Sequence, residues 1–382
     1  MKIGLIKNCS LVSPDIEIDG ATIEIHDNVI HKIYEPGTPL PKADWIHDAA
    51  EQFVMPGFID IHTHGALGYD ITDDDPKAVT EVARAKLAEG VTSFCPTTLT
   101  LSEEQLSASV QRVADYKKTT KYSKVIGVHL EGPFINSGAL GAQNPAFVRK
   151  PALEEVLRLN AICKISQVTY AAEVDGGVDF ARQLIDNGIV PSCGHSKCTC
   201  AQFKAAYAAG LRHLTHFCNQ MTPLHHRDIG LVGAGLLIDD VMIEMICDKI
   251  HLCPEMIELA FQVKDIEKIA LITDSMRASH LPDGKSSIGG LDVEVKNGVA
   301  RLVKDGALAG STLKLNDALK NAWEVTGLPL GELVKATSWN QARELGIDNL
   351  GRIEPGFIAD IVILDEETFA PVAVFIDGEK RL

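Results

Sequence analysis

Eight short apolar segments, separated by stretches with helical spacing, limit the fold of this chain more than any other feature of its sequence. The eight segments are Phe58–His62, Val91–Pro96, Val125–Leu130, Gln167–Ala172, Ile189–Cys193, His213–Phe217, Met242–Cys247 and Ile269–Thr273. The helical stretches between them include Pro76–Glu89, Glu103–Lys118, Val178–Asn187, Cys200–Ala209 and Pro254–Val263. This alternation is typical of a parallel sheet with crossover helices. Eight such units over about 290 residues indicate a TIM barrel rather than an open sheet.

Both ends of the chain contain short strand patterns instead. Before residue 50 these are Gly4–Ile6, Ile16–Ile18, Ala21–His26 and Val29–Tyr34, separated by turn signals such as Asp19-Gly20. Two further strand patterns follow residue 351. We therefore expect an α/β fold with a (β/α)8 TIM barrel at residues 56–349. The two chain ends, residues 1–55 and 350–382, are expected to form one small β-sandwich domain.

Charge and composition exclude several classes of partner. The chain has 36 Lys and Arg against 52 Asp and Glu, a net charge of −16. Such a field repels polyanions, so we expect no nucleic-acid partner and no membrane partner. No segment reaches the roughly 18 apolar residues of a membrane span, and the start lacks the pattern of a secretory signal. Nine cysteines, mostly within apolar segments, are expected to be free thiols of a cytoplasmic protein.

Polar side chains close six of the eight apolar segments. In a TIM barrel the C-terminal strand ends form the catalytic face, so these residues are the informative ones. They are His62 and His64, His129 and Glu131, His195, His216, Asp248, and Asp274. A single histidine or aspartate at a strand end is usually structural or caps a helix. Imidazoles and carboxylates that converge from several strands, however, form a ligand set suited to Zn²⁺ or Fe²⁺. The sequence therefore predicts a metal site.

A second interpretation places a metal at Cys193, Cys198 and Cys200, which surround His195. We consider it weaker, because a structural zinc site needs two spaced ligand pairs and no second pair follows.

Phosphate binding has two candidate segments. The glycine-rich run of residues 230–235 resembles a phosphate-binding loop only loosely, because no strand leads into it. The cationic residues His225-His226-Arg227, Lys249 and His251 follow the sixth and seventh segments, where TIM barrels often bind phosphate. Arginine also suits a bidentate grip on phosphate. The alternative for these residues is an ordinary solvated basic loop.

Motifs spread over the whole chain carry a resemblance to a known family. They are residues 55–65 (MPGFIDIHTHG), 129–134 (HLEGPF), 144–149 (NPAFVR), 194–196 (GHS), 215–221 (THFCNQM), 225–233 (HHRDIGLVG), 273–276 (TDSM), 308–311 (LAGS) and Gly351 through Ala359-Asp360. The sequence resembles the amidohydrolase superfamily and, within it, the N-acetylglucosamine-6-phosphate deacetylases. The resemblance implies deacetylation of N-acetyl-D-glucosamine 6-phosphate to D-glucosamine 6-phosphate and acetate, in amino-sugar catabolism.

The resemblance also implies roles for individual residues. A primary divalent metal, Zn or Fe, would be held by Glu131, His195 and His216. His62 and His64 leave open a second metal bridged by Glu131. Asp274 corresponds to the catalytic acid and base. Contacts with the phosphorylated N-acetylated amino sugar would come from Ala142, Gln143, Asn219, Gln220, His251 and Arg227, with Arg227 reaching across the interface of a homodimer.

Three departures from the family pattern lie among the expected substrate contacts. They are Gln143 in Gly141-Ala142-Gln143, Gln220 in Asn219-Gln220-Met221, and Lys249 in Asp248-Lys249-Ile250-His251. They do not affect the metal ligands, but they leave the identity of the sugar substrate undecided. The alternatives are an N-acetylgalactosamine-6-phosphate deacetylase, which acts on the C4 epimer, and a non-catalytic amidohydrolase-like scaffold. A cyclic-amide hydrolase is disfavoured, because the fourth segment ends without a lysine.

Overall fold

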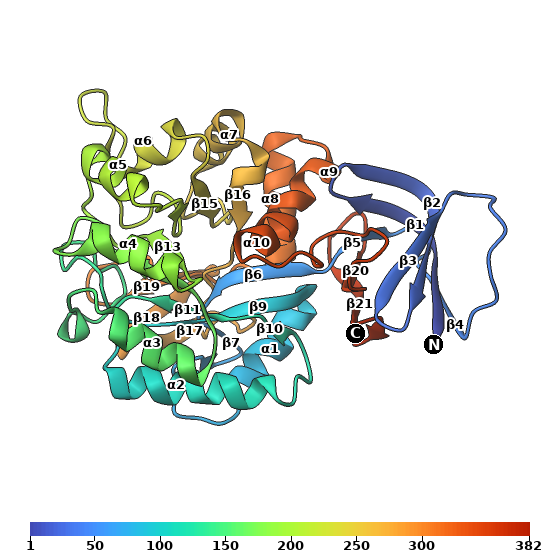
Figure 1. Cartoon of the computed structure of the whole chain (residues 1–382), viewed down its shortest axis with the longest axis horizontal. Coiled ribbons are helices and arrows are strands. Elements are labelled where there is room, and N and C mark those ends of the chain that lie inside the picture. The colour runs from blue at the N-terminus through green and yellow to red at the C-terminus, as the bar shows by residue number, and fades with distance from the viewer.

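The computed structural model describes all 382 residues and contains a helix-covered barrel and a smaller sheet at one end of it (Figure 1). The barrel strands, in sequence order, are β6 (Phe58–Thr63), β9 (Val91–Thr98), β11 (Val128–Glu131), β12 (Ile165–Tyr170), β13 (Val190–Cys193), β14 (His213–Leu214), β15 (Met242–Met245) and β16 (Ile269–Leu271). Each pairs in parallel with the next, and the short β10 (Lys124–Val125) adds to β9. These strands fall on the eight apolar segments, so the predicted fold class is confirmed.

The barrel closes between its last and first strands. Thr63 forms a parallel bridge with Ser275, and the backbone N–H of Asp274 donates to the carbonyl of His62 at 2.8 Å. The C-terminal ends of β6 and β16 are therefore fixed to each other. This closure brings residues more than two hundred positions apart to the same face of the barrel.

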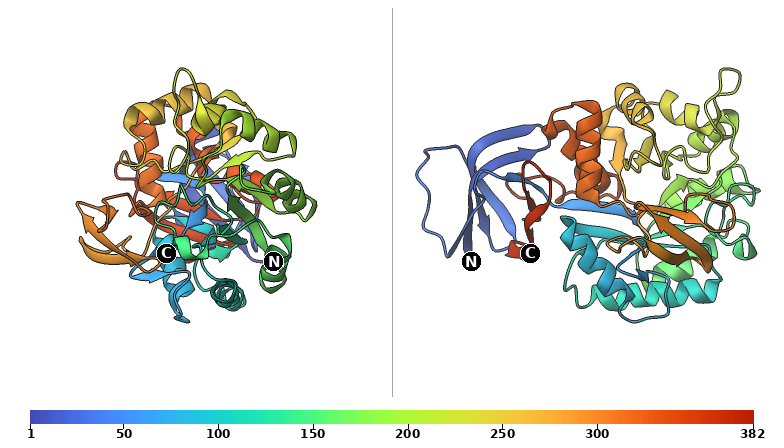
Figure 2. Two further views of the ribbon diagram at one scale, coloured as in Figure 1. Left: turned by 90° about the vertical axis from the view of Figure 1, so that its left-hand side faces the viewer. Right: turned by 180° about the vertical axis from the view of Figure 1, so that it is seen from behind.

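Helices cover the outside of the barrel (Figures 1 and 2). They are α1 (Ala78–Ala88), α2 (Glu103–Lys117), α3 (Leu153–Ile162), α4 (Gly177–Asp186), α5 (Cys200–Ala208), α6 (Gly230–Leu237), α7 (Pro254–Val263), α8 (Leu315–Thr326), α9 (Leu330–Leu333) and α10 (Trp339–Glu344), with 3₁₀ turns at Pro145–Phe147, Ile266–Lys268 and Val334–Thr337. Their apolar faces pack inward, as with Phe180, Ala181 and Leu184 of α4. No helix has the length and apolar character needed to span a bilayer.

Strands from both chain ends form one eight-stranded sheet, which we call the end sheet. It contains β1 (Ile3–Ser13), β2 (Ile16–His26), β3 (Val29–Tyr34), β4 (Trp45–Asp48), β5 (Phe53–Pro56), β20 (Ile361–Leu364), β21 (Pro371–Ile376) and β22 (Glu379–Lys380). The two ends join where β5 pairs with β20, with Val54 opposite Ile363. Only Gly57 separates β5 from β6. The end sheet therefore adjoins the N-terminal ends of the barrel strands, opposite their C-terminal ends.

Several parts of the fold were not predicted, among them helix α6 and helices α8 to α10. Helix α3 was missing from the expected helices, and no structure was assigned to the segment after β16. That segment forms an antiparallel sheet of β17 (Gly284–Ile288), β18 (Leu291–Lys296) and β19 (Val299–Leu302). A two-stranded ladder, β7 (Gly65–Ala66) with β8 (Tyr69–Asp70), also follows β6.

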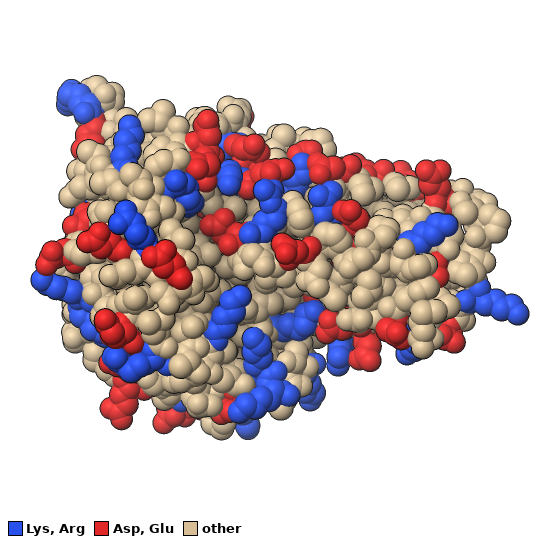
Figure 3. All heavy atoms as spheres, in the orientation of Figure 1, with Lys and Arg blue, Asp and Glu red and all other residues tan.

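Acidic and basic side chains are interspersed over the face drawn in Figure 3.

Candidate active site

Six of the side chains predicted from strand ends meet at the C-terminal end of the barrel. His62 and His64 come from the end of β6, Glu131 ends β11, and the other three directly follow β13, β14 and β16. Those three are His195, His216 and Asp274. All six are buried, and Asp274 is the most accessible at 9%. Two further predicted strand-end residues, His129 and Asp248, do not join this group.

Glu131 is the centre of this group. Its Oε1 lies 3.3 Å from Nε2 of His62, 3.3 Å from Nε2 of His195 and 3.1 Å from Nε2 of His216. Its Oε2 lies 3.2 Å from Nε2 of His64. The ligand atoms thus form two groups of three that share Glu131: His62 and His64 with Glu131, and Glu131 with His195 and His216.

The hydrogen bonds of the imidazoles test whether a cation fits there. Nδ1 of His195 faces the carbonyl of Ala139 at 2.8 Å, and Nδ1 of His64 faces the carbonyl of Thr97 at 3.2 Å. A carbonyl only accepts, so each Nδ1 carries a proton and Nε2 is the nitrogen whose lone pair a bound cation would use. Yet Nε2 of His195 lies 3.0 Å from Nε2 of His216. Lone pairs held this close around a carboxylate are the donor arrangement of a divalent cation.

The backbone is strained where three of these side chains turn inward. His195, His216 and Asp274 have φ of 47°, 32° and 47°. Non-glycine residues rarely adopt this left-handed region, and such strain concentrates at functional sites. Backbone bonds hold the strained conformation, for example from the N–H of Asn136 to the carbonyl of His195 at 3.0 Å.

Asp274 lies beside both ligand groups. Its Oδ1 is 3.3 Å from Nε2 of His64 and 3.5 Å from Nε2 of His62. Burial raises the pKa of Asp274, but the charge of His62 and the hydrogen bond with His64 lower the pKa more, and it ends below its ordinary value. Burial likewise opposes ionisation of Glu131, whereas His62 and His195 hold its pKa well below the usual range. Both carboxyl groups are therefore ionised at neutral pH.

Glu244, in the middle of β15, was not predicted as a site residue. Its Oε2 lies 3.0 Å from Nδ1 of His62 and accepts the backbone N–H of His216 at 3.1 Å. Its Oε1 accepts from Nε2 of Gln167 at 2.7 Å and lies 3.0 Å from Nε2 of His213. Glu244 thus supports one candidate ligand from each group. The signal for it in the sequence is a lone carboxylate inside an apolar segment.

A cavity of about 290 Å³ opens above these residues. Five of the six predicted substrate contacts line it: Ala142, Gln143, Asn219, Gln220 and His251. Its apolar wall was not predicted and comes from Leu99, Ile288, Ala307 and Leu308. Ile288 belongs to β17, so the unpredicted three-stranded sheet forms part of this wall.

Gln143 also contacts a candidate metal ligand. Its Nε2 donates to Oε2 of Glu131 at 2.5 Å, and its Oε1 accepts the backbone N–H of Thr100 at 2.7 Å. The side chain therefore connects the cavity wall to the carboxylate at the centre of the site.

Four of the five predicted cationic residues lie outside this cavity: His225, His226, Arg227 and Lys249. The guanidinium of Arg227 donates to Nε2 of His226 at 2.8 Å in the exposed loop between β14 and α6. Lys249 forms an ion pair with Glu324 at 2.7 Å. Within one chain, therefore, the structure does not bring Arg227 to the group of residues predicted with it.

The structure supports neither the cysteine metal site nor the glycine-rich phosphate loop. Cys193, Cys198 and Cys200 are free thiols, and none belongs to a group of three converging ligands. The glycine-rich run forms helix α6 rather than a loop, and a Cβ on Gly235 would lie 2.6 Å from Leu214. Gly235 therefore allows α6 to pack closely against β14.

Comparisons with known proteins agree with this geometry. The model of the amidohydrolase family matches residues 53–381. The N-acetylglucosamine-6-phosphate deacetylase of Bacillus subtilis is 35% identical over 95% of this chain and 93% of the relative. The N-acetylgalactosamine-6-phosphate deacetylase of Escherichia coli O157:H7 is 36% identical over 91% of each chain. A mutant N-acetyl-D-glucosamine-6-phosphate deacetylase of Mycobacterium smegmatis, solved in complex with N-acetyl-D-glucosamine-6-phosphate, is 29% identical over 100% of both chains, with a TM-score of 0.93. The chain therefore belongs to the amidohydrolase family and, within it, to the family of the N-acetylglucosamine-6-phosphate deacetylases.

Proposed function

We propose that this protein hydrolyses the acetamide of N-acetyl-D-glucosamine 6-phosphate, giving D-glucosamine 6-phosphate and acetate in amino-sugar catabolism. The observation that carries the proposal is the position of Glu131, whose two oxygens contact four imidazoles beside Asp274. This group lies at one end of a cavity lined by the family's motif residues. The names and the bound sugar phosphate of the relatives support the same reaction.

Two cation positions follow from the ligand groups. Glu131, His195 and His216 would hold the primary divalent cation, zinc or iron, and His62 and His64 would hold a second one with Glu131. A divalent cation bound there supplies Lewis-acid chemistry, since it lowers the pKa of water and polarises a carbonyl. Glu244 and the carbonyls of Ala139 and Thr97 keep the imidazoles oriented for this task.

Asp274 is the proton carrier of the proposed reaction. Its ionised carboxylate accepts a proton from water as the water oxygen attacks the acetyl carbon. The same proton then passes to the sugar nitrogen as the C–N bond breaks, so that acetate and the free amine leave. The 6-phosphate serves as a remote handle that holds the acetamide in place.

The variant Asp274→Asn tests this role. An amide cannot accept the proton, so we expect kcat to fall by about 10²- to 10⁴-fold, the usual contribution of general acid–base catalysis. Acetate release measures the rate, and metal analysis of the same samples shows whether the ion is retained. A kcat near that of the wild type would remove Asp274 from the mechanism.

An acetate-release assay on a panel of sugars tests the substrate. We expect kcat/KM to be highest for N-acetylglucosamine 6-phosphate and to drop sharply without the phosphate. A higher kcat/KM for the galacto epimer would favour the alternative named by the Escherichia coli relative. No release from any sugar after metal reconstitution would favour the scaffold.

We also propose a homodimer in which Arg227 binds the phosphate in the partner's site. Arg227 is exposed and outside the cavity of its own chain. Next to its loop lies an apolar groove between α6 and α7 that includes Leu224, Leu237 and Val263, which are 47%, 60% and 49% exposed. A second copy would remove this apolar surface from water.

Mixed dimers test the position of Arg227. Neither Arg227→Ala nor Asp274→Asn alone is expected to have normal activity, but mixing them should create one intact composite site per dimer. Recovered acetate release after demonstrated subunit exchange supports the arrangement. Absence of recovery would mean that Arg227 acts within its own chain.

Nine free cysteines support a cytoplasmic location, because thiols persist in a reducing compartment.

A further inference from the structure

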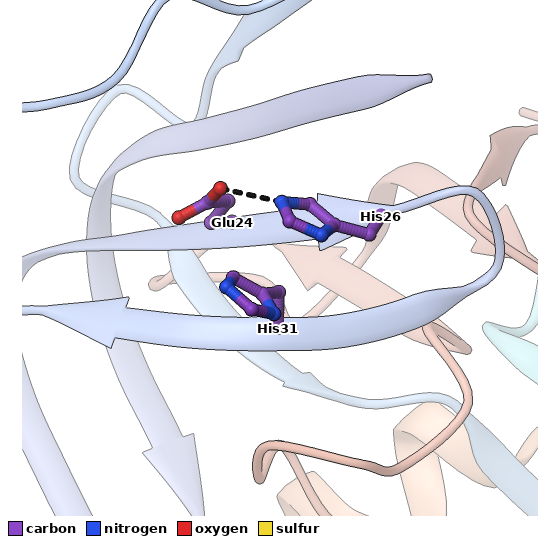
Figure 4. A group of neighbouring side chains, drawn as sticks. All are labelled: Glu24, His26 and His31. Atoms are coloured by element: carbon purple, nitrogen blue, oxygen red, sulfur yellow. Dashed lines mark hydrogen bonds and ion pairs between the residues drawn. The ribbon is translucent and has the colours of Figure 1, made fainter. Parts of the chain in front are cut away.

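The end sheet carries a second cluster of metal-ligating side chains. Glu24 and His26 lie two residues apart on β2, so they share one face of the sheet, and His31 reaches them from β3 (Figure 4). Nε2 of His26 is 2.6 Å from Oε1 of Glu24, and the ligand atoms of all three residues lie within 4.8 Å of one another. The end sheet adjoins the end of the barrel opposite the proposed catalytic face, so this cluster is distinct from the site above.

A β-bulge brings His31 into the cluster. In the pairing of β2 with β3, Glu24 is opposite Lys32 whereas Ile25 is opposite Ile30, so His31 is the extra residue. Bulges of this kind re-aim a side chain. As a result the His31 ring stacks on the His26 ring, with centroids 3.8 Å apart and planes 10° apart. In Figure 4 both rings direct a nitrogen toward Glu24.

The neighbouring residues prepare the carboxylate. The hydroxyl of Tyr34 donates to Oε2 of Glu24 at 2.6 Å, which leaves Oε1 to face the imidazoles. Lys32 lies opposite Glu24 but forms no ion pair with it, and its ammonium sits over the Tyr34 ring, 4.6 Å from the centroid. A hydrogen bond that fixes a ligating carboxylate in this way is the usual support of a metal ligand.

The His31 side chain has no hydrogen bond or ion pair to the rest of the protein, and it is exposed. Glu24 forms an ion pair with His26 alone, so the ring nitrogens of His31 have no partner within the chain.

We propose that Glu24, His26 and His31 bind a divalent transition-metal cation, with Zn²⁺ as the matched ion. Two imidazole nitrogens and one carboxylate oxygen are one of the ligand sets that bind zinc in proteins, with solvent completing the coordination. Binding replaces the His26–Glu24 hydrogen bond and tilts the exposed His31 ring out of the stack, so that both rings point at one ion. The ion then links β2 to β3 across the bulge and stabilises the folded chain by mass action.

Equilibrium dialysis of the zinc-loaded holoenzyme against buffered Zn²⁺ tests this site. We expect the wild type to bind one equivalent per chain more than His31→Gln, with the same kcat for both proteins. His47→Gln is the matched control, because His47 lies on β4 of the same sheet, packs edge-on against Phe375 and belongs to no such cluster. It should take up zinc like the wild type.

The melting temperature gives a second measurement. Zn²⁺ added beyond the requirement of the barrel site should raise Tm of the wild type and of His47→Gln, but not of His31→Gln. Equal zinc uptake by the wild type and His31→Gln would overturn the proposal. An equal loss of uptake in His31→Gln and His47→Gln would also overturn it, because the effect would then not belong to this cluster.

Discussion

At the scale of single residues, hydrogen bonds to the ring nitrogens that face away from Glu131 orient the imidazoles. Glu244 receives hydrogen bonds from His62, His213 and the backbone of His216. Burial lowers the pKa of His213, but the hydrogen bonds to Glu244 and Glu344 raise it to about 9. His213 is therefore a donor at both nitrogens and holds Glu244 in place. Glu244 in turn fixes which nitrogen of His62 faces Glu131.

We expect Glu244→Gln to weaken binding of the second cation. An amide is a poorer acceptor for Nδ1–H of His62, and loss of such a supporting group typically costs about 10- to 100-fold in metal affinity or activity. Metal content per chain after dialysis, together with kcat, measures the effect. Glu344→Gln is the matched control, because Glu344 bonds the other nitrogen of His213 and does not contact His62. Unchanged metal content in Glu244→Gln, or the same loss in the control, would contradict this role.

The strand-end residues could be recognised individually, because a polar side chain that closes an apolar segment is visible in the sequence. The supporting residues could not. Gln143 was predicted as a substrate contact, and its hydrogen bond to Glu131 depends on how the loop after β11 folds back over the barrel. Glu244 is a carboxylate inside an apolar strand, and only the position of its partners shows what it does.

At the scale of elements, helix starts are set locally. Helix α5 begins at a capping box, in which Thr199 Oγ accepts the N–H of Gln202 at 3.3 Å and the Gln202 side chain accepts the N–H of Thr199 at 2.9 Å. The pattern Thr-x-x-Gln is readable in the sequence, and the predicted helix Cys200–Ala209 differs from the observed one by a single residue. The cap also ends the loop that carries His195.

Thr199→Ala should destabilise the protein by about 1 kcal/mol, the usual cost of losing an N-cap hydroxyl. The free energy of unfolding in urea measures the change. Thr199→Ser keeps the hydroxyl and should retain most of the stability. An equal loss in Thr199→Ser would point to the methyl group rather than the cap.

Elements whose form depends on packing were harder to predict. The glycine-rich run was a weak candidate for a phosphate loop, yet it is helix α6, because Gly235 lets the helix approach Leu214 and Phe217 closely. The sheet β17–β19 lies in a segment without repeat or helical spacing. The hairpin of β18 and β19, by contrast, has a local signal that was missed, because residues 291–296 alternate apolar and polar side chains and lead into the turn Asn297-Gly298.

At the scale of the whole molecule, Lys124 is one of the cationic side chains that join the barrel to the end sheet, and Lys335, which pairs with Asp15, is another. Nζ of Lys124, on β10, lies 2.9 Å from Asp360 and 2.9 Å from Asp377, which flank the C-terminal strands. Burial lowers the pKa of Lys124, but the two aspartates raise it above its ordinary value. Burial raises the pKa of Asp360, and the charge of Lys124 offsets this only in part. The carboxylate of Asp360 therefore bears most of the cost of desolvating the pair. We propose residues 1–55 with 350–382, and residues 56–349, as the two domains that this contact links.

Lys124→Met should destabilise the protein by about 1–3 kcal/mol, because it leaves a buried carboxylate without its partner. The folded pKa of Lys124 is raised, so its contribution is fully present below its unfolded pKa and is lost as the pH rises through the folded value. The difference in unfolding free energy between wild type and Lys124→Met should therefore stay constant from pH 7 to about pH 10 and shrink above that. Lys124→Arg, which keeps the charge, is the control. A difference that grows above pH 10 would contradict this origin.

The sequence by itself determined the barrel, the pairing of the two chain ends and the polar residues that close the barrel strands. These features depend on hydrophobic periodicity, on the length of each apolar segment and on turn residues, all of which act over a few neighbouring positions. The tertiary structure alone decided what those residues do to each other. Closure of β6 against β16 brings His62 and Asp274 together, and a bulge turns His31 toward His26. Such contacts depend on distances in space between side chains far apart in the chain, and no local pattern encodes them.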